Sequence, residues 1–158
     1  MFVRRGGTDR DETITAKIPP GVGDGQTIRL RGQGEQRPNT GVPGDLLITI
    51  RVTPHPFFRR NGLDLEVDVP VTVGEAALGT KVDVPSPHGT IALKIPAGTS
   101  SGKRLRIKGQ GVYRKDEKGD LYAVVQIVLP GKIDSESAEL LKKFDQQHPF
   151  NPRAELRW

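Results

Sequence analysis

The stretch KIPPGVGDGQTIRLRGQG, residues 17–34, recurs later in the chain as KIPAGTSSGKRLRIKGQG, residues 94–111, with nine of eighteen positions identical. The identical positions include the Gly-Gln-Gly triplet that ends each copy, so turn chemistry repeats together with the apolar pattern. A Gly-Asp-Leu triplet follows each copy, at 44–46 and at 119–121. Two copies at this spacing predict tandem related domains, because a solenoid needs three or more repeats.

Around the repeat, apolar and polar residues alternate with a period of two, which is typical of strands with one buried face. No segment between these stretches has a long helical period, so the pattern favours antiparallel sheets over βαβ units. Nineteen glycines and thirteen prolines indicate many short strands joined by turns. The predicted inward-facing residues are Leu46, Ile48, Ile50 and Val52; Leu63, Leu65, Val67, Val69 and Val71; Ile91, Leu93 and Ile95; and Leu121, Ala123, Val125, Ile127 and Leu129.

The sequence therefore predicts a mainly β fold of two tandem small β-sandwich-like modules with a short carboxy-terminal helix. The predicted divisions are residues 1–57, 58–131 and 132–158. A helical turn is expected at 75–78, and a helix capped by Asp134 or Ser135 is expected before Pro149. The second copy is preceded by a strand and a turn that the first copy lacks. We therefore expect the first module to be incomplete at its amino end and the chain to be a fragment of a longer protein, or Met1 not to be its natural start.

Composition excludes several kinds of site. The chain has no cysteine, which rules out disulfides, thiolate nucleophiles and cysteine-based metal sites, and its three histidines are too few and too scattered for a histidine cluster. We expect no metal and no cofactor. The apolar runs are too short to cross a bilayer and residues 1–7 lack the apolar core of a signal peptide, which predicts a cytoplasmic location and no membrane partner.

No motif in the sequence indicates catalysis. The Gly-Gln-Gly triplets do not continue as a phosphate-binding loop, and the interpretation we favour is a turn or bulge in which glycine supplies a positive φ. His55 and His148 each precede a proline and have no serine nucleophile motif, so both are interpreted as turn residues. We therefore predict that the chain is not an enzyme and has no catalytic residue.

Basic residues offer a second possible function. The formal net charge is +5, and Arg104, Arg106 and Lys108 alternate along one strand and share its exposed face. Such a stripe can track phosphates. Tyr113 is the neighbouring aromatic residue, so base stacking has little support and a simply solvated strand face competes with DNA binding.

Five blocks of the chain resemble a known family in order and spacing. They are IPPGVGDGQTIRLRGQG, GDLLITIRVTPHPFFRRNGLDL, PVTVGEAALGTKVDVP, IPAGTSSGKRLRIKGQG and GDLYAVVQIVLP. Together they are similar to the carboxy-terminal region of DnaJ-type co-chaperones, over about residues 13–130. The tail at 150–153, after a short helix, resembles the curved-DNA-binding branch of that family.

The resemblance implies a clamp that holds extended apolar segments of non-native polypeptide for a DnaK-type chaperone. The sequence has no His-Pro-Asp tripeptide, so contact with the DnaK-type partner through a J domain is not expected from this chain. It also lacks the cysteine-rich zinc insertion of some family members. The alternative function that the resemblance implies is DNA binding.

The resemblance also implies which residues act. The client groove would involve Leu46, Ile48 and Ile50 together with Phe2 and Val3, which match the facing strand. The terminal helix would join two copies as a homodimer. Its apolar stripe consists of Leu140, Leu141 and Phe144.

Overall fold

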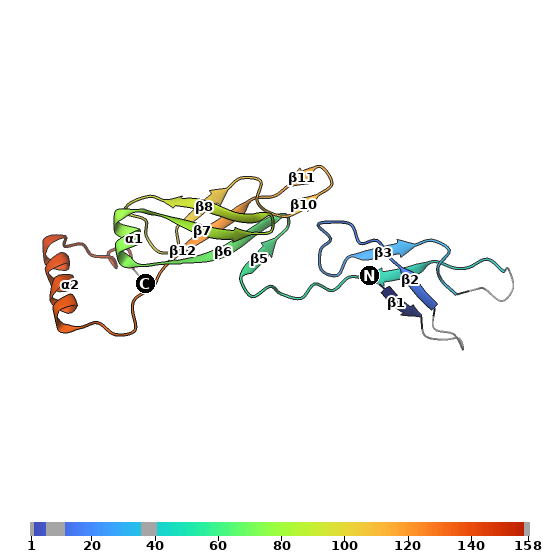
Figure 1. Cartoon of the computed structure of the whole chain (residues 1–158), viewed down its shortest axis with the longest axis horizontal. Helices are drawn as coiled ribbons and strands as arrows, with labels where there is room; N and C mark the ends of the chain where they lie inside the picture. Colours follow the sequence, from blue (N-terminus) through green and yellow to red (C-terminus); the bar gives the residue numbers. More distant parts are fainter. Residues whose placement is uncertain (1, 6–11, 36–40, 157–158) are drawn as a thin grey trace. The chain divides into compact units, whose positions relative to one another are not determined.

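The computed structural model describes residues 2–5, 12–35 and 41–156, and for residues 2–5, 12 and 13 it describes the backbone alone. Most elements are short strands (Figure 1), so the prediction of a mainly β fold with a short carboxy-terminal helix is confirmed. The strands are β1 Phe2–Arg5, β2 Glu12–Thr15, β3 Thr27–Leu30, β4 Leu46–Thr49, β5 Phe58–Asn61, β6 Asp64–Val71, β7 Thr80–Ser86, β8 Gly89–Ile95, β9 Arg104–Ile107, β10 Tyr113–Arg114, β11 Glu117–Lys118 and β12 Leu121–Ile127; the helices are α1 Val73–Leu78 and α2 Ser135–Gln147.

A four-stranded sheet in the order β5-β6-β12-β9 organises the second half of the chain. β12 runs antiparallel to β9 but parallel to β6, with Leu121 opposite Leu65. The expectation of purely antiparallel sheets is therefore wrong for this pair. Parallel neighbours need a long connection, and here α1, the β7–β8 hairpin, β9 and the β10–β11 hairpin supply it without the long helical period that a βαβ unit would show.

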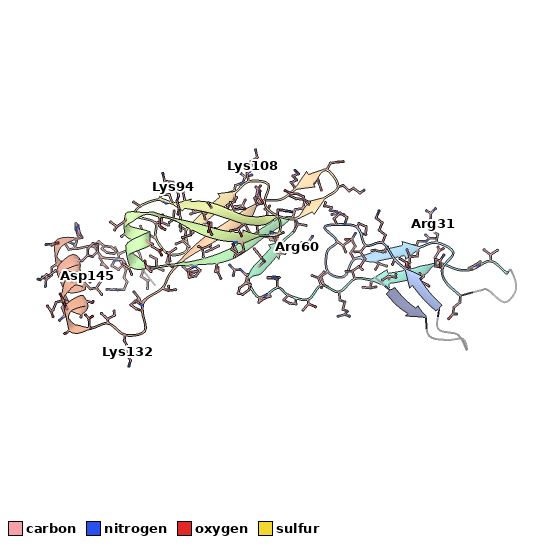
Figure 2. All side chains as sticks on the ribbon, in the orientation of Figure 1. Arg31, Arg60, Lys94, Lys108, Lys132 and Asp145 are labelled. Carbon is pink, nitrogen blue, oxygen red and sulfur yellow. The ribbon has the colours of Figure 1, made fainter. Side chains whose placement is uncertain are left out.

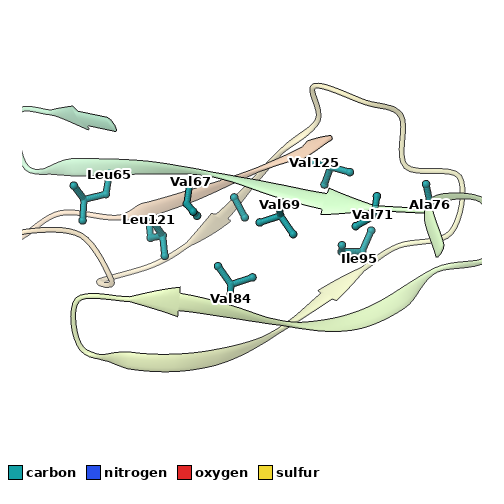
Figure 3. Close-up of a cluster of buried hydrophobic side chains, with 10 residues drawn as sticks. Leu65, Val67, Val69, Val71, Ala76, Val84, Ile95, Leu121 and Val125 are labelled. Atoms are coloured by element: carbon teal, nitrogen blue, oxygen red, sulfur yellow. The ribbon is translucent and has the colours of Figure 1, made fainter. Parts of the chain in front are cut away.

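The hydrophobic core lies between this sheet and the β7–β8 hairpin. The predicted faces of β6 and β12 point inward, and Val84 of β7 and Ile95 of β8 pack against them (Figure 3). Val84 and Leu121 are completely inaccessible to solvent. The members of the core are Leu65, Val67, Val69, Val71, Ala76, Val84, Ile95, Leu121, Ala123 and Val125.

The first half of the chain has a much thinner core. Before residue 58, Ala16 is the one apolar side chain that is buried among those the structure describes. Ile28 and Ile48 are half-buried, and their neighbours in sequence are exposed, which confirms the predicted alternation. The strands end earlier than predicted: β4 ends at Thr49 and β12 ends at Ile127. Two residues predicted to face inward lie beyond these ends and are exposed, Val52 to 47% and Leu129 to 66%.

The sequence repeat is also a repeat of backbone pairing. In the first copy β3 pairs with β4 and sets Leu30 opposite Leu46; in the second copy β9 pairs with β12 and sets Ile107 opposite Leu121. The flanking bonds correspond as well: Gly25 N donates to Ile50 O at 2.8 Å, and Gly102 N donates to Val125 O at 2.7 Å. The two copies therefore share one register, as the matching sequences suggested.

Helix α2 begins at a predicted cap, whereas α1 begins at Val73, two residues before the predicted turn at 75–78. Thr72 and Glu75 form a reciprocal capping box at the start of α1. The Asp134 side chain accepts from Ser137 N at 2.7 Å and caps α2, which decides between the two predicted caps. Neither helix that the structure describes is long and apolar enough to cross a membrane.

The chain divides into two compact units, Met1–Ile127 and Val128–Trp158. Every strand pair that the structure describes lies wholly before residue 57 or wholly after it. The predicted module boundaries at 57 and 131 stay predictions.

Candidate functional site

The same ion-paired turn occurs once in each repeat, and we call it the aspartate clasp. In the first copy Arg29 Nε donates to Asp45 Oδ2 at 2.5 Å, and Gly32 N donates to Asp45 Oδ1 at 3.0 Å. In the second copy Arg106 Nε donates to Asp120 Oδ2 at 2.6 Å, and Gly109 N donates to Asp120 Oδ1 at 2.7 Å. Each clasp ties the Gly-Gln-Gly turn to the start of the strand that follows the Gly-Asp-Leu triplet.

The clasps hold their carboxylates in the ionised form. The Gly32 N–H and then the Arg29 guanidinium lower the pKa of Asp45, and the Gly109 N–H and the Arg106 guanidinium lower the pKa of Asp120. Partial desolvation opposes both shifts. A charge-assisted hydrogen bond to the ionised carboxylate outweighs that desolvation.

Glycine is needed in the triplets for two different reasons. The first glycine of each has a positive φ, 66° at Gly32 and 69° at Gly109, which confirms the turn interpretation. The last glycine lies directly against backbone: a Cβ on Gly34 would be 2.7 Å from Asp45 O, and one on Gly111 would be 2.6 Å from Asp120 O. The triplets are therefore structural turns that bring each clasp together.

The predicted client-binding residues form part of a half-buried apolar face on β3 and β4. Cross-strand pairing sets Ile28 opposite Ile48 and Leu30 opposite Leu46, so the four side chains share one face. All four are half-buried, whereas Leu47, on the other face, is 64% exposed. We call this the β3–β4 apolar face.

The remaining predicted groove residues are placed less completely. Ile50 is half-buried just beyond β4, where its N–H donates to Gln26 O at 2.8 Å and continues the pairing with the first repeat. Phe2 and Val3 belong to β1, which pairs with β2. The side chains of Phe2 and Val3 lie outside the part of the chain whose side chains are described, so the facing wall of the predicted groove stays a prediction.

The predicted DNA-binding stripe is largely occupied by ion pairs. Arg104, Arg106 and Lys108 are all exposed, as expected. However, Arg104 Nη2 lies 2.5 Å from Glu66 Oε1, and Arg106 is held in the second clasp. Lys108, which is labelled in Figure 2, has no ion-pair partner among the described residues. Pairing leaves less positive charge along β9 for phosphate than the sequence suggested.

The carboxy-terminal helix presents its apolar stripe to solvent. None of the residues of α2 is buried. The exposed fractions are 61% for Leu140, 42% for Leu141 and 50% for Phe144. An uncovered apolar stripe of this kind suits a partner surface.

His55 acts through its ring nitrogen as a turn acceptor. Its Nδ1 accepts from Phe57 N at 3.1 Å and from Phe58 N at 3.3 Å, which confirms the turn interpretation. At the other end of the chain His148 is the C-cap of α2 and its ring packs against Phe144.

Sequence reasoning missed the two clasp carboxylates, although the repeated Gly-Asp-Leu triplet was the signal that marks them.

All five sequence blocks lie within a match to one domain family. A protein-family model described as the DnaJ C terminal domain matches residues 3–130. The chain belongs to the DnaJ C-terminal domain family. Within this family it is 51% identical over 143 residues to the curved DNA-binding proteins of Escherichia coli O1:K1 / APEC, of Escherichia coli O127:H6 (strain E2348/69 / EPEC) and of Shigella flexneri.

The match covers most of this chain but only part of each relative. The matched region covers 90% of this chain and 47% of each of these relatives. The chain thus spans about half the length of the curated relatives it matches. As a DnaJ C-terminal domain it corresponds to the region that the five sequence blocks predicted.

The clasp of the second DnaJ C-terminal repeat predicts a pH-dependent contribution to stability. Because the pKa of Asp120 in the folded chain lies below the ordinary value of about 3.9, ionised Asp120 stabilises the fold above that pH, and the contribution disappears as pH falls through the lowered value. We expect Asp120→Asn to lower the free energy of unfolding at neutral pH, and the difference from wild type to shrink in acid. Urea unfolding at several pH values measures this difference.

The matched control is Asp116→Asn, which removes the same charge from an exposed position in the turn between β10 and β11. Its stability should follow wild type at every pH. Equal stability of wild type and Asp120→Asn at neutral pH would contradict the role given to the clasp.

Proposed function

We propose that the chain binds non-native polypeptide through the β3–β4 apolar face. The observation that carries this proposal is the set of half-buried Ile28, Leu30, Leu46 and Ile48 side chains on a module whose described core contains one buried apolar residue. Such side chains are held in place by the sheet, yet each still has apolar surface to lose to a ligand. Membership of the DnaJ C-terminal domain family supports a polypeptide ligand.

The energetics suit a weak and permissive binder. Fully burying one aliphatic side chain contributes about 1.5–3 kcal/mol, and side chains that are already half-buried gain only part of that. An extended ligand can add main-chain hydrogen bonds at a sheet edge, and these do not depend on its sequence. The chain is thus suited to act within a longer DnaJ-type co-chaperone that delivers clients to a DnaK-type chaperone.

Two adjacent residues of β4 provide the test of this face. Ile48→Ala removes apolar surface from the β3–β4 apolar face, whereas Leu47→Ala removes similar surface from the opposite face. We expect Ile48→Ala to raise the Kd for an uncharged apolar peptide by about five- to tenfold, from the loss of roughly 1 kcal/mol of apolar contact. Leu47→Ala should leave the Kd within about twofold.

Fluorescence anisotropy of a labelled peptide measures the Kd, and suppression of the aggregation of a denatured protein provides a second measurement. Thermal unfolding of both variants checks that the modules stay folded. If the two variants bind alike, or if wild type binds no apolar peptide and suppresses no aggregation, the proposal is wrong.

We also propose that α2 joins two copies of the chain. The uncovered stripe of Leu140, Leu141 and Phe144 supports a two-fold contact, in which the same stripe would be buried on both copies. Two apolar faces in one dimer would then hold a long client with higher avidity than either face alone.

A charge placed in the stripe tests this assembly. Leu141→Asp should convert a dimer into a monomer, because an ionised carboxylate buried in an apolar contact has no partner. Gln146→Asp introduces the same charge at an exposed position away from the stripe and should leave the dimer intact. Sedimentation velocity gives the mass; a monomeric wild type, or a dimeric Leu141→Asp variant, would show that the stripe does not join two copies.

DNA binding is the second candidate function, and it is favoured by the similarity to proteins named curved DNA-binding proteins. Of the three predicted residues, Lys108 is the one whose charge has no ion-pair partner in the described part of the chain. The pairing of Arg104 and Arg106 with carboxylates argues against a strong phosphate track on β9.

Salt dependence distinguishes this second function. If Lys108 contacts a phosphate, Lys108→Gln should lower the slope of log K against log salt by about 1. Lys132→Gln, a change of the same charge in the other compact unit, should leave the slope unchanged. Affinity for duplex DNA that is independent of salt, or absent at low salt, would remove this candidate.

A further inference from the structure

A cavity of about 840 Å³ opens where the first repeat meets β5 and the β10–β11 hairpin. Its surface is predominantly apolar, and several of its apolar residues also border the core of the second half. We call it the junction cavity. Its apolar lining residues are Val52, Pro54, Phe58, Leu63, Leu65, Pro87 and Val112.

One arginine fixes the two sides of this cavity. Arg60, on β5, donates from Nη1 to Val22 O at 2.8 Å and from Nη2 to Gly21 O at 2.7 Å (Figure 2). Its Nε donates to Gly62 O at 2.8 Å, which holds the guanidinium in one orientation. The turn of the first repeat is therefore attached to the second half by directed hydrogen bonds.

Two further contacts keep the walls in place. Gly21 has a φ of 77°, and a Cβ at this position would be 2.7 Å from Tyr113 O and 2.8 Å from Arg114 Cβ, so the turn lies directly on the β10–β11 hairpin. On the other wall, Asp24 Oδ1 accepts from Val52 N at 2.8 Å. The cavity is thus formed by contacts that are already present without a ligand.

The charges around the cavity are unbalanced. Its lining includes three arginines, Arg59, Arg60 and Arg114, but one carboxylate, Asp24. Arg59 is neutralised by Asp68 through two hydrogen bonds of 2.7 Å. Arg60 bonds to carbonyl oxygens, which do not cancel its charge, and the guanidinium of Arg114 has no ion-pair partner among the described residues.

We propose that the junction cavity binds a polypeptide segment in which an apolar side chain lies next to a carboxylate. The apolar side chain would pack on Leu63 and Val112, and the carboxylate would pair with Arg114, whose planar guanidinium suits a carboxylate. The proposal rests on the proposed function in one respect, because a polypeptide ligand is taken from it. It adds a preference for acidic and apolar segments that the uncharged β3–β4 apolar face does not provide.

Polypeptide fits this cavity better than nucleic acid does. The two ligands share an attraction to Arg114, but a phosphate backbone would leave the seven apolar lining residues without a contact. A segment with both an apolar and an acidic side chain satisfies both parts of the lining.

The test uses two labelled peptides of equal length, one with two leucines flanked by aspartates and one with the aspartates replaced by asparagines. Arg114→Gln removes the unpaired charge, and Lys115→Gln removes the same charge from the next residue of the hairpin, outside the cavity lining. We expect Arg114→Gln to weaken binding of the acidic peptide by about three- to fivefold and to leave the asparagine peptide unchanged. Lys115→Gln should affect neither peptide by more than about twofold.

Several results would overturn this proposal. One is equal weakening by Arg114→Gln and Lys115→Gln, which would indicate a general charge effect; another is no weakening by either variant. Displacement of the acidic peptide by duplex DNA, but not by the same peptide without its label, would assign the cavity to nucleic acid. The proposed function is judged separately: if Ile48→Ala weakens the uncharged peptide while Arg114→Gln leaves the acidic peptide unaffected, the β3–β4 apolar face stands and the junction cavity does not.

Discussion

The pairing of one aspartate with an arginine and a glycine N–H is the constraint on which each repeat depends. Asp45 and Asp120 each stand immediately before a strand, β4 or β12, and each bind the turn that precedes it. Because the bond joins a fixed point of the turn to a fixed point of the next strand, it sets the register of the pair. A slip of one residue would turn the apolar side chains to the opposite face. The clasp thus determines which residues of β4 form the candidate binding face.

The same constraint explains how the candidate sites differ between the repeats. In the second copy the face set by the clasp is buried under the β7–β8 hairpin and becomes the core. In the first copy the equivalent face, with Ile28 and Ile48, is left half-buried. One register therefore produces a core in one place and an accessible apolar surface in another, according to what covers it.

Much of the fold could be predicted from the sequence because the decisive signals are local. Period-two alternation identified the inward faces of β6 and β12, and glycine triplets with repeated spacing identified the turns. The parallel pairing of β6 with β12 was not predictable from such signals, since it depends on which distant strands meet. The strand ends were placed too late at Val52 and Leu129, because an apolar residue shortly before a proline continues the pattern without continuing the strand.

For the candidate sites, the sequence could predict which side chains are exposed but not which other residues they contact. Alternation placed Arg104, Arg106 and Lys108 on the exposed face, but it could not show that Glu66 of β6 and Asp120, just before β12, neutralise two of them. The junction cavity gave no sequence signal, because its walls come from segments far apart in the chain and are joined by Arg60 through backbone carbonyls. Local sequence patterns do not reveal contacts between distant segments of the chain.

The position of β12 between β6 and β9 also governs the order of events during synthesis. β6 is made early but acquires its parallel neighbour only when Ile127 has left the ribosome, and until then one side of a strongly apolar strand stays unpaired. Non-local pairing of this kind is slow and exposes an edge prone to aggregation. Until β12 is complete, the chain would therefore itself present the kind of unpaired apolar segment that a chaperone binds.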